Sequence, residues 1–214
     1  MAIEAVIWDF GGVFTTSPFE AFQRYEVERG LPTDFIRTVN ATDPDTNAWA
    51  RFERAEIDAA GFDGLFLDEA TRLGHAVRGA DVLPLLYGDL RPRVLAALKT
   101  CKAAGFKVGC ITNNVPTGHG PGMAQSTEKA VAVGEIMAHF EVVIESSKAG
   151  VRKPDPRIYL MMCEALEVAP AGCVYLDDLG INCKPAAALG MTAIKVSTED
   201  QLLADLAKAT GLAF

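Results

Sequence analysis

AVIWDFGGV, residues 5–13, is the stretch that decides the fold. Its apolar run ends abruptly at Asp9, and the Gly11-Gly12 pair then allows a sharp turn. Such a run is typical of a buried strand, and the carboxyl ends of parallel strands are where ligands bind. A carboxylate in these apolar surroundings needs a cation, a hydrogen bond or a reaction to offset its burial. Asp9 is therefore a candidate nucleophile or metal ligand, and an ordinary turn residue is the alternative.

The composition is that of a compact, acidic protein. The 214 residues are 50% hydrophobic, and 20 basic against 28 acidic side chains leave a formal net charge of −8. We expect one domain, or one domain with a modest insertion, and no nucleic-acid partner. The five cysteines form no C-x-x-C pair, which is typical of free thiols. No apolar run approaches the roughly 20 residues that cross a bilayer, so we expect a cytoplasmic protein without a membrane partner.

Short apolar runs rich in β-branched residues alternate with segments of helical spacing. This alternation predicts an α/β fold with a Rossmann-like parallel sheet wrapped by helices. About a hundred residues separate the first run from the second, far more than one crossover needs, so a further element is inserted there. The runs are AVIW (5–8), FKVGCI (106–111), VVI (142–144), CVYL (173–176) and TAIKV (192–196).

The inserted stretch, residues 18–87, has the apolar and charged spacing of helices, as in FEAFQRYEVERG and AWARFERAEIDAAGFDGLF. We expect a helical cap over the carboxyl ends of the strands, and a core made of residues 1–17 and 88–214. Turn-forming residues at both boundaries suit two hinge linkers. A rigidly docked helical subdomain is the alternative.

Polar side chains follow the predicted strands at the points where they end. Each has a structural explanation of its own, as a turn residue, a surface charge or the cap of a helix that begins near Gly180. Together, acids, a hydroxyl and a lysine at successive strand ends indicate a site for a phosphate and a divalent metal. Besides Asp9, these residues are Thr112, Asn113 and Asn114, then Ser146, Ser147 and Lys153, and finally Asp177 and Asp178.

Four segments carry a resemblance to a known family. WDFGGV, ITNN, RKPDPRIY and VYLDDLGIN are similar in order and spacing to the four motifs of the haloacid dehalogenase-like hydrolase superfamily. The resemblance extends from Ala5 to Val196, and its most specific element is RKPDP followed by a strand that ends in Asp-Asp. Within the superfamily, DFGGV, TTSPFEAF and DDLGIN look most like the branch of the N-terminal phosphatase domain of soluble epoxide hydrolase. The resemblance implies a Rossmann-like core, a C1-type helical cap and a Mg²⁺-dependent phosphatase.

The resemblance also implies a role for each site residue. Asp9 would attack a small organic phosphate and form an aspartyl phosphate intermediate. The proposed Mg²⁺ ligands are the Asp9 carboxylate, the Gly11 carbonyl and a carboxylate from Asp177 or Asp178, of which Asp178 is the first choice. The catalytic residues would be Asp9, Thr112 and Lys153, the phosphate-binding residues Thr112, Asn113 and Lys153, and Asn182 a positioning residue.

One position departs from the phosphatase pattern. Two residues after the nucleophile these enzymes usually carry a second Asp, the general acid and base, and here the residue is Gly11. Because acid–base assistance contributes about 10²–10⁴-fold, we expect slow turnover unless another group substitutes. Candidate substitutes are Glu53, Glu56 and Asp58 in the predicted cap, and His119 in a loop rich in Gly and Pro.

Two other functions stay open at this point. A haloacid dehalogenase-type hydrolase would use Asp9 without a metal, and the adjacent acids Asp177 and Asp178 argue against it. A non-catalytic phosphate- or metal-binding regulatory protein is supported mainly by Gly11.

The sequence does not identify the substrate. Selectivity would come from the cap, where Phe19, Phe22, Trp49 and Phe52 suit either a surface facing the substrate or the cap's own core. A homodimer through an apolar face of the helical insertion is a further hypothesis.

Overall fold

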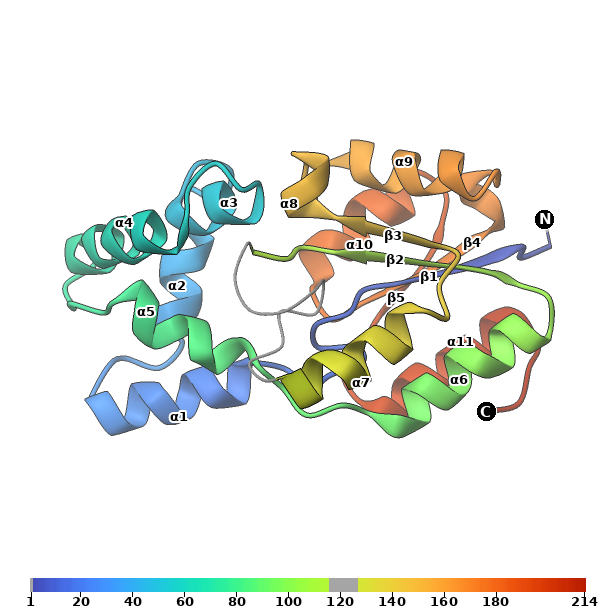
Figure 1. The fold of residues 1–214 in the computed structure, drawn as a ribbon, viewed down its shortest axis with the longest axis horizontal. Coiled ribbons are helices and arrows are strands. Elements are labelled where there is room, and N and C mark those ends of the chain that lie inside the picture. Colours follow the sequence, from blue (N-terminus) through green and yellow to red (C-terminus); the bar gives the residue numbers. More distant parts are fainter. Residues whose placement is uncertain (1, 116–126) are drawn as a thin grey trace.

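The computed structural model describes residues 2–115 and 127–214, which form a parallel sheet wrapped by helices and a helical insertion beyond the carboxyl ends of the strands (Figure 1). The sheet pairs in the order β3-β2-β1-β4-β5, and every pairing is parallel. The predicted α/β, Rossmann-like fold is therefore confirmed. The strands are β1 (Ala5–Trp8), β2 (Lys107–Thr112), β3 (Val142–Glu145), β4 (Cys173–Asp177) and β5 (Thr192–Lys195).

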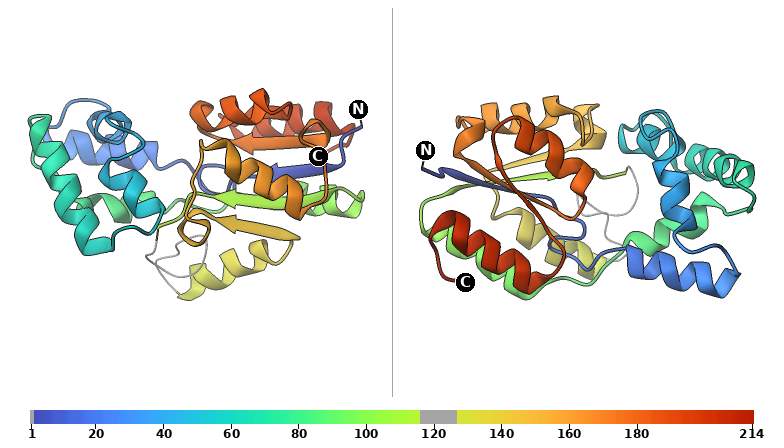
Figure 2. Two further views of the ribbon diagram at one scale, coloured as in Figure 1. Left: turned by 90° about the horizontal axis from the view of Figure 1, so that it is seen from above. Right: turned by 180° about the vertical axis from the view of Figure 1, so that it is seen from behind.

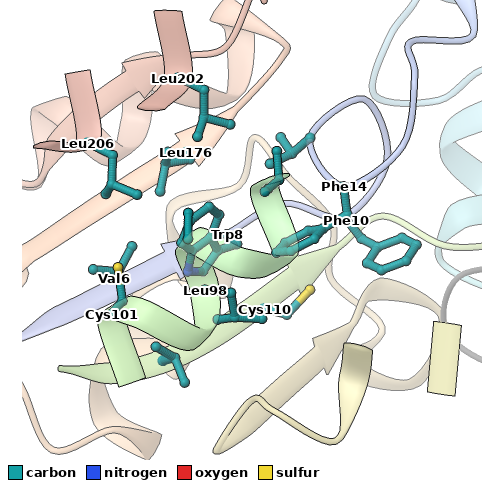
Figure 3. Packing of buried hydrophobic residues seen from close by; sticks show 14 of the residues in the cluster. Val6, Trp8, Phe10, Phe14, Leu98, Cys101, Cys110, Leu176, Leu202 and Leu206 are labelled. Carbon is teal, nitrogen blue, oxygen red and sulfur yellow. The ribbon is translucent and has the colours of Figure 1, made fainter. Parts of the chain in front are cut away.

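The central strand β1 is buried on both faces, which explains its unbroken apolar run. Side chains alternate along a strand, so Val6 and Trp8 join one core cluster while Ala5 and Ile7 join the other. On the first face, Trp8 packs near Leu98 in a cluster without exposed members (Figure 3). The strand that leads to Asp9 is thus held from two sides.

Helices cover both faces of the sheet, as parallel strands require (Figure 2). Helix α9 (Pro156–Ala165) starts at a proline, and Asp155 caps it by accepting from the N–H of Arg157 at 2.9 Å. A single turn, α8 (Ser146–Ala149), and a short 3₁₀ turn, η2 (Pro170–Gly172), complete the connections. One face carries α6 (Pro92–Ala103), α7 (Thr127–Met137) and α11 (Glu199–Thr210), and the other carries α9 (Pro156–Ala165) and α10 (Gly180–Ala188).

The insertion between β1 and β2 is helical and has its own apolar core. Phe52 stacks on Phe62 with ring centroids 4.8 Å apart, and Trp49 meets the same ring edge-on at 5.1 Å. Phe22 is buried in this cluster and Phe19 packs against it, so all four aromatic candidates lie in the insertion's own core. Its elements are α1 (Phe19–Arg29), α2 (Phe35–Ala41), α3 (Ala48–Glu53), α4 (Ala59–Arg72), α5 (Gly79–Val82) and η1 (Leu83–Leu86).

The two chain segments that join the insertion to the sheet pair with each other. Thr15 and Leu90 form an isolated antiparallel bridge, and the N–H of Thr16 donates to the carbonyl of Asp89 at 2.9 Å. The N–H of Asp89 returns a hydrogen bond to the Thr16 hydroxyl at 3.0 Å. The chain therefore enters and leaves the insertion through one narrow, paired connection (Figure 1).

All five cysteines are buried and free. Among the described residues, no helix combines the length and the apolar character that crossing a membrane requires.

The first prediction concerns the packing between α6 and the sheet. Leu98→Ala removes a side chain with 0% exposure, and we expect it to lower the free energy of unfolding by about 2–5 kcal/mol. Val131→Ala is the control, because Val131 is 58% exposed and its loss should change stability by less than about 0.5 kcal/mol. Urea denaturation followed by circular dichroism measures both, and equal effects would contradict the assignment of this face as the core.

Candidate active site

Asp9 lies where β1 ends, beside the end of β4. Its main-chain N–H donates to the carbonyl of Leu176 at 2.8 Å, which continues the β1–β4 pairing and brings Asp9 level with Asp177. The chain runs from β1 outward to β3 on one side and returns to β4 on the other, so the strand order reverses here. Open α/β sheets bind ligands at such a reversal. Asp9 therefore stands where a ligand site is expected.

A buried ammonium group joins the two strand ends. Lys153 Nζ lies 2.6 Å from Asp9 Oδ1 and 2.8 Å from Asp177 Oδ2. It also donates to the carbonyl of Ile111 at 3.0 Å, so each of its three N–H groups has a partner. Burial alone would lower the pKa of Lys153, but the charges of Asp177 and Asp9 raise it above its ordinary value. Lys153 is therefore a permanent cation, although its side chain is only 1% exposed.

Asp177 is engaged by protein groups on both carboxylate oxygens. Oδ2 accepts from the Tyr175 hydroxyl at 2.5 Å as well as from Lys153. Oδ1 accepts from the N–H of Leu179 at 2.8 Å, and Asn182 Nδ2 lies 3.1 Å from both oxygens. These donors fix the Asp177 carboxylate, and the fixed carboxylate in turn holds the ammonium group of Lys153; Asp177 is called the anchor for this reason. Asn182, expected as a positioning residue, contacts this anchor.

Three carboxylates and one lysine share the site. Asp9, Asp177 and Asp178 each offer an oxygen within 4.8 Å of the others. Burial raises the pKa of Asp9 well above its usual range against the pull of Lys153, and burial and the charge of Asp177 raise that of Asp178 to about 7. The raised pKa values mean that three ionised carboxylates beside a single ammonium group are unfavourable without a further cation. Hard carboxylate oxygens with excess negative charge suit a divalent cation such as Mg²⁺.

The turn after Asp9 is shaped by Gly12 and Arg91. Gly12 has a φ of +73°, and a Cβ there would collide with the carboxylate of Asp178, so glycine is required on both counts. Arg91 Nη1 donates to the carbonyl of Gly12 at 3.0 Å, and its charge lowers the pKa of Asp178 against the dominant effect of burial. The sequence does not indicate this role of Arg91, because no local spacing links it to Gly12, 79 residues earlier.

Thr112 and Asn113 follow β2 toward the site. Thr112 is buried and level with Glu145 of β3. Asn113 makes two hydrogen bonds with the main chain of Lys153: its Oδ1 accepts from the N–H at 2.9 Å, and its Nδ2 donates to the carbonyl at 3.0 Å. The same Nδ2 also donates to Glu53 Oε2 at 3.2 Å. The structure thus places the Asn113 side chain against the backbone of Lys153, and the phosphate contacts of Thr112 and Asn113 stay predictions.

Gly11 lies exposed beside Asp9 and has room for a side chain. A Cβ built on Gly11 meets no heavy atom of the described residues within 4 Å, and its φ lies outside the left-handed region. In contrast to Gly12, neither backbone conformation nor space among these residues requires glycine here. A side chain can therefore begin at this position without a clash at its Cβ among the described residues.

The candidate substitutes for the missing acid lie in different places. Glu56 pairs with Arg54 at 2.6 Å on the exposed side of the insertion, and Asp58 caps α4. Glu53 lies at the contact between α3 and the core, where it is paired with other groups. His119 lies outside the described residues. Of these three acids, Glu53 is the one whose side chain contacts a core residue named at the site.

The motifs, the fold and the site agree with one family. A family model for haloacid dehalogenase-like hydrolases matches residues 3–190. The chain belongs to this family, and it is a hydrolase.

Relatives of known name include phosphatases. The chain is 30% identical to bifunctional epoxide hydrolase 2 of Sus scrofa over 99% of its own length and 40% of that protein. It is 31% identical to acyl-CoA dehydrogenase family member 10 of Mus musculus over 94% of its own length and 18% of that protein. The chain therefore spans less than half of these two relatives. It is 28% identical to the phosphatase MT3486 of Mycobacterium tuberculosis over 96% of this chain and 94% of that protein.

Solved structures share the fold. A HAD family enzyme from Bacteroides thetaiotaomicron, in complex with magnesium and inorganic phosphate, has a TM-score of 0.59 and 19% identity over 92% of this chain and 96% of that one. The L-2-haloacid dehalogenase from Xanthobacter autotrophicus has a TM-score of 0.60 and 20% identity over 97% of this chain and 84% of that one. The same fold thus carries more than one chemistry.

The second prediction concerns the buried ammonium. Lys153→Met leaves Asp9 and Asp177 without their cation, and we expect the free energy of unfolding to fall by about 3–5 kcal/mol. The double variant Lys153→Met with Asp177→Asn should recover part of this loss, since one uncompensated charge is also removed. Urea denaturation measures the series.

Lys148→Met is the control for this series, because Lys148 pairs with Glu145 on the surface, where its side chain is 76% exposed. Its effect should stay below about 1 kcal/mol. A double variant less stable than Lys153→Met alone would contradict the charge argument.

Proposed function

We propose that the chain is a Mg²⁺-dependent phosphatase that hydrolyses a small phosphomonoester through an aspartyl phosphate on Asp9. The observation that carries the proposal is the contact of 2.6 Å between Lys153 Nζ and Asp9 Oδ1, beside a cluster of three carboxylates. A nucleophilic carboxylate, a fixed cation and a set of metal ligands meet the separate electrostatic needs of phosphoryl transfer. Relatives named as phosphatases support the same reading.

Asp9 is oriented for attack by its hydrogen bonds. Its Oδ1 accepts from the N–H of Phe10 at 2.7 Å and faces Lys153, so the carboxylate is fixed before substrate arrives. In the first step an Asp9 oxygen forms a bond to phosphorus as the bond from phosphorus to the substrate oxygen breaks. Lys153 and the Thr112 hydroxyl would stabilise the charge on the phosphoryl oxygens. In the second step the oxygen of a water molecule forms a bond to phosphorus as the bond between phosphorus and the Asp9 oxygen breaks. The protons of the water leave with the inorganic phosphate, and the Asp9 carboxylate is restored.

The metal ligands would be Asp9, the Gly11 carbonyl and Asp178. Asp178 remains the first choice of the adjacent acids, because both oxygens of Asp177 already accept hydrogen bonds from protein groups. When bound, Mg²⁺ offsets the repulsion between the Asp9 carboxylate and the phosphate dianion. Asp177 would act indirectly, by holding Lys153.

Because Gly11 stands where these enzymes usually carry a general acid, the departure of the leaving group is the step that should be slow. The substrate oxygen departs as an alkoxide unless it gains a proton, and Gly11 has none to give. A phosphate ester with an acidic leaving group avoids this need and should react faster. The cytoplasmic location and the homodimer stay predictions.

The two alternatives gain less support. Dehalogenation by Asp9 would need no metal, so it gives no use to Asp178 beside Asp9. A regulatory protein without turnover would need neither the nucleophile nor the lysine in contact with it. Halide release from 2-haloacids, assayed beside phosphate release, separates these functions.

The third prediction tests the nucleophile and the metal together. Phosphate release from a panel of phosphomonoesters should require Mg²⁺, stop after chelation and fall below detection in Asp9→Asn. Mg²⁺ should also raise the melting temperature of the native protein, because a ligand that binds the folded state stabilises it. Asp178→Asn should lose most of this shift. Metal-independent turnover that survives Asp9→Asn would contradict the proposal.

The fourth prediction concerns the empty position beside the nucleophile. Gly11→Asp should increase phosphate release by up to about 10²–10⁴-fold for esters of alcohols, and much less for p-nitrophenyl phosphate, whose leaving group needs no acid. Gly11→Asn is the matched control, since it has the same shape and no carboxyl proton. Equal rates in the Asp and Asn variants would show that acid–base assistance is not what the native site lacks.

A further inference from the structure

A buried carboxylate of the insertion reaches into the core next to the site. Glu53 ends α3 and is 6% exposed. Its Oε1 accepts from the indole N–H of Trp49 at 3.0 Å, within the insertion. Its Oε2 faces the core, where it lies 2.5 Å from Arg152 Nε and accepts from Asn113 Nδ2 at 3.2 Å. The contact with Arg152 is an ion pair, since the Nε–H is not aligned as a hydrogen bond to this oxygen.

Glu53 is linked to Lys153 through Asn113. The Asn113 amide makes two hydrogen bonds to the main chain of Lys153, one to the N–H at 2.9 Å and one to the carbonyl at 3.0 Å. Lys153 in turn places its ammonium 2.6 Å from Asp9. A continuous series of polar contacts therefore runs from α3 to the nucleophile. Such outer partners commonly fix the orientation of the groups that do the chemistry.

The same contacts tie the insertion to the core. Arg152, the neighbour of Lys153, donates from Nη1 to the carbonyl of Pro44 at 2.8 Å. The Ser146 hydroxyl donates to the main-chain carbonyl of Glu53 at 2.7 Å. Both contacts come from residues that precede Lys153, one in α8 and one in the loop of residues 150–155 that carries it, called the lysine loop below. These contacts form only while the insertion is docked, because each joins an atom of the insertion to an atom of the core.

We infer that Glu53 is a positioning residue that holds Lys153 in place only while the insertion is docked on the core. The inference rests on the proposed function, because it assigns Lys153 to phosphoryl transfer. Docking of α3 brings the Glu53 carboxylate against Asn113 and Arg152, and these two residues hold the lysine loop. The insertion then contributes to catalysis by orienting the cation, in addition to any contact with substrate.

Glu53→Gln tests this inference, because it keeps the shape of the side chain but removes the charge that faces Arg152. We expect kcat to fall about 10- to 100-fold with KM changed less than about twofold, since a misplaced group affects the transition state more than binding. Glu26→Gln is the matched control. Glu26 is also a buried glutamate of the insertion, at 2% exposure, but its carboxylate accepts from the N–H groups of Asp34 and Ile36 within the insertion.

A second readout does not depend on activity. The N–H of Lys153 is bonded to Asn113 Oδ1, so its hydrogen exchange, followed by NMR, reports on this contact. Exchange of this amide should become at least about tenfold faster in Glu53→Gln and stay unchanged in Glu26→Gln. If Glu53→Gln does not fold, Arg152→Gln removes the other charge of the same ion pair and should give the same result.

The outcomes separate the inference from the proposed function. Native protein that releases no phosphate would overturn the proposed function, and the exchange of the Lys153 amide would still decide whether Glu53 holds the lysine loop. Unchanged exchange in both Glu53→Gln and Arg152→Gln would overturn the inference. So would equal losses of kcat in Glu53→Gln and Glu26→Gln, because they would reflect damage to the insertion alone.

Discussion

The structure depends on one buried ammonium group held between two carboxylates. Lys153 comes from the loop after β3 and α8, and its partners Asp9 and Asp177 stand at the ends of neighbouring strands. Burying one of these charges without a partner would cost a large amount of free energy. The three groups are therefore charged only when they lie together. The sheet order, the turn at Gly12 and the donors around Asp177 all serve this arrangement. Folding and the proposed chemistry therefore depend on the same contact.

The charge balance of the site explains why its neighbours matter. One lysine cannot balance the charge of three acids when all three are ionised, which favours a divalent cation at the site. The neighbouring carboxylates also keep Lys153 protonated. Both carboxylate oxygens of Asp177 accept hydrogen bonds from protein groups, whereas the carboxylate of Asp178 is more available to a metal ion. Adjacent acids of the same type thus have different tasks, set by the donors around each of them.

The fold, and the meeting of polar side chains at one sheet edge, could be predicted from the sequence, while most contacts between distant segments could not. The apolar run before Asp9 and the alternation of strands and helices report local structure, and the motif order predicts that Lys153 and the Asp177-Asp178 pair meet where the strands end, as they do in the structure. The roles of these residues stay predictions. Arg91 and Glu53 were harder, because their roles come from tertiary contacts that no local spacing encodes. The sequence offers Glu53 only as a candidate substitute for the acid, and its ion pair with Arg152 is visible only in the structure.

The pairing between Thr15 and Leu90 affects how freely the length of the inserted segment can change. The chain leaves the core and returns to it at adjacent points, so the two ends of the helical insertion are held together by this pairing and not by the helices between them. Lengthening, shortening or exchanging the inserted segment changes little in the entropy of closing the chain at that junction. A helical segment of another length could therefore be joined at the same two points, since doubling the length of a closed loop costs only about 0.6 kcal/mol.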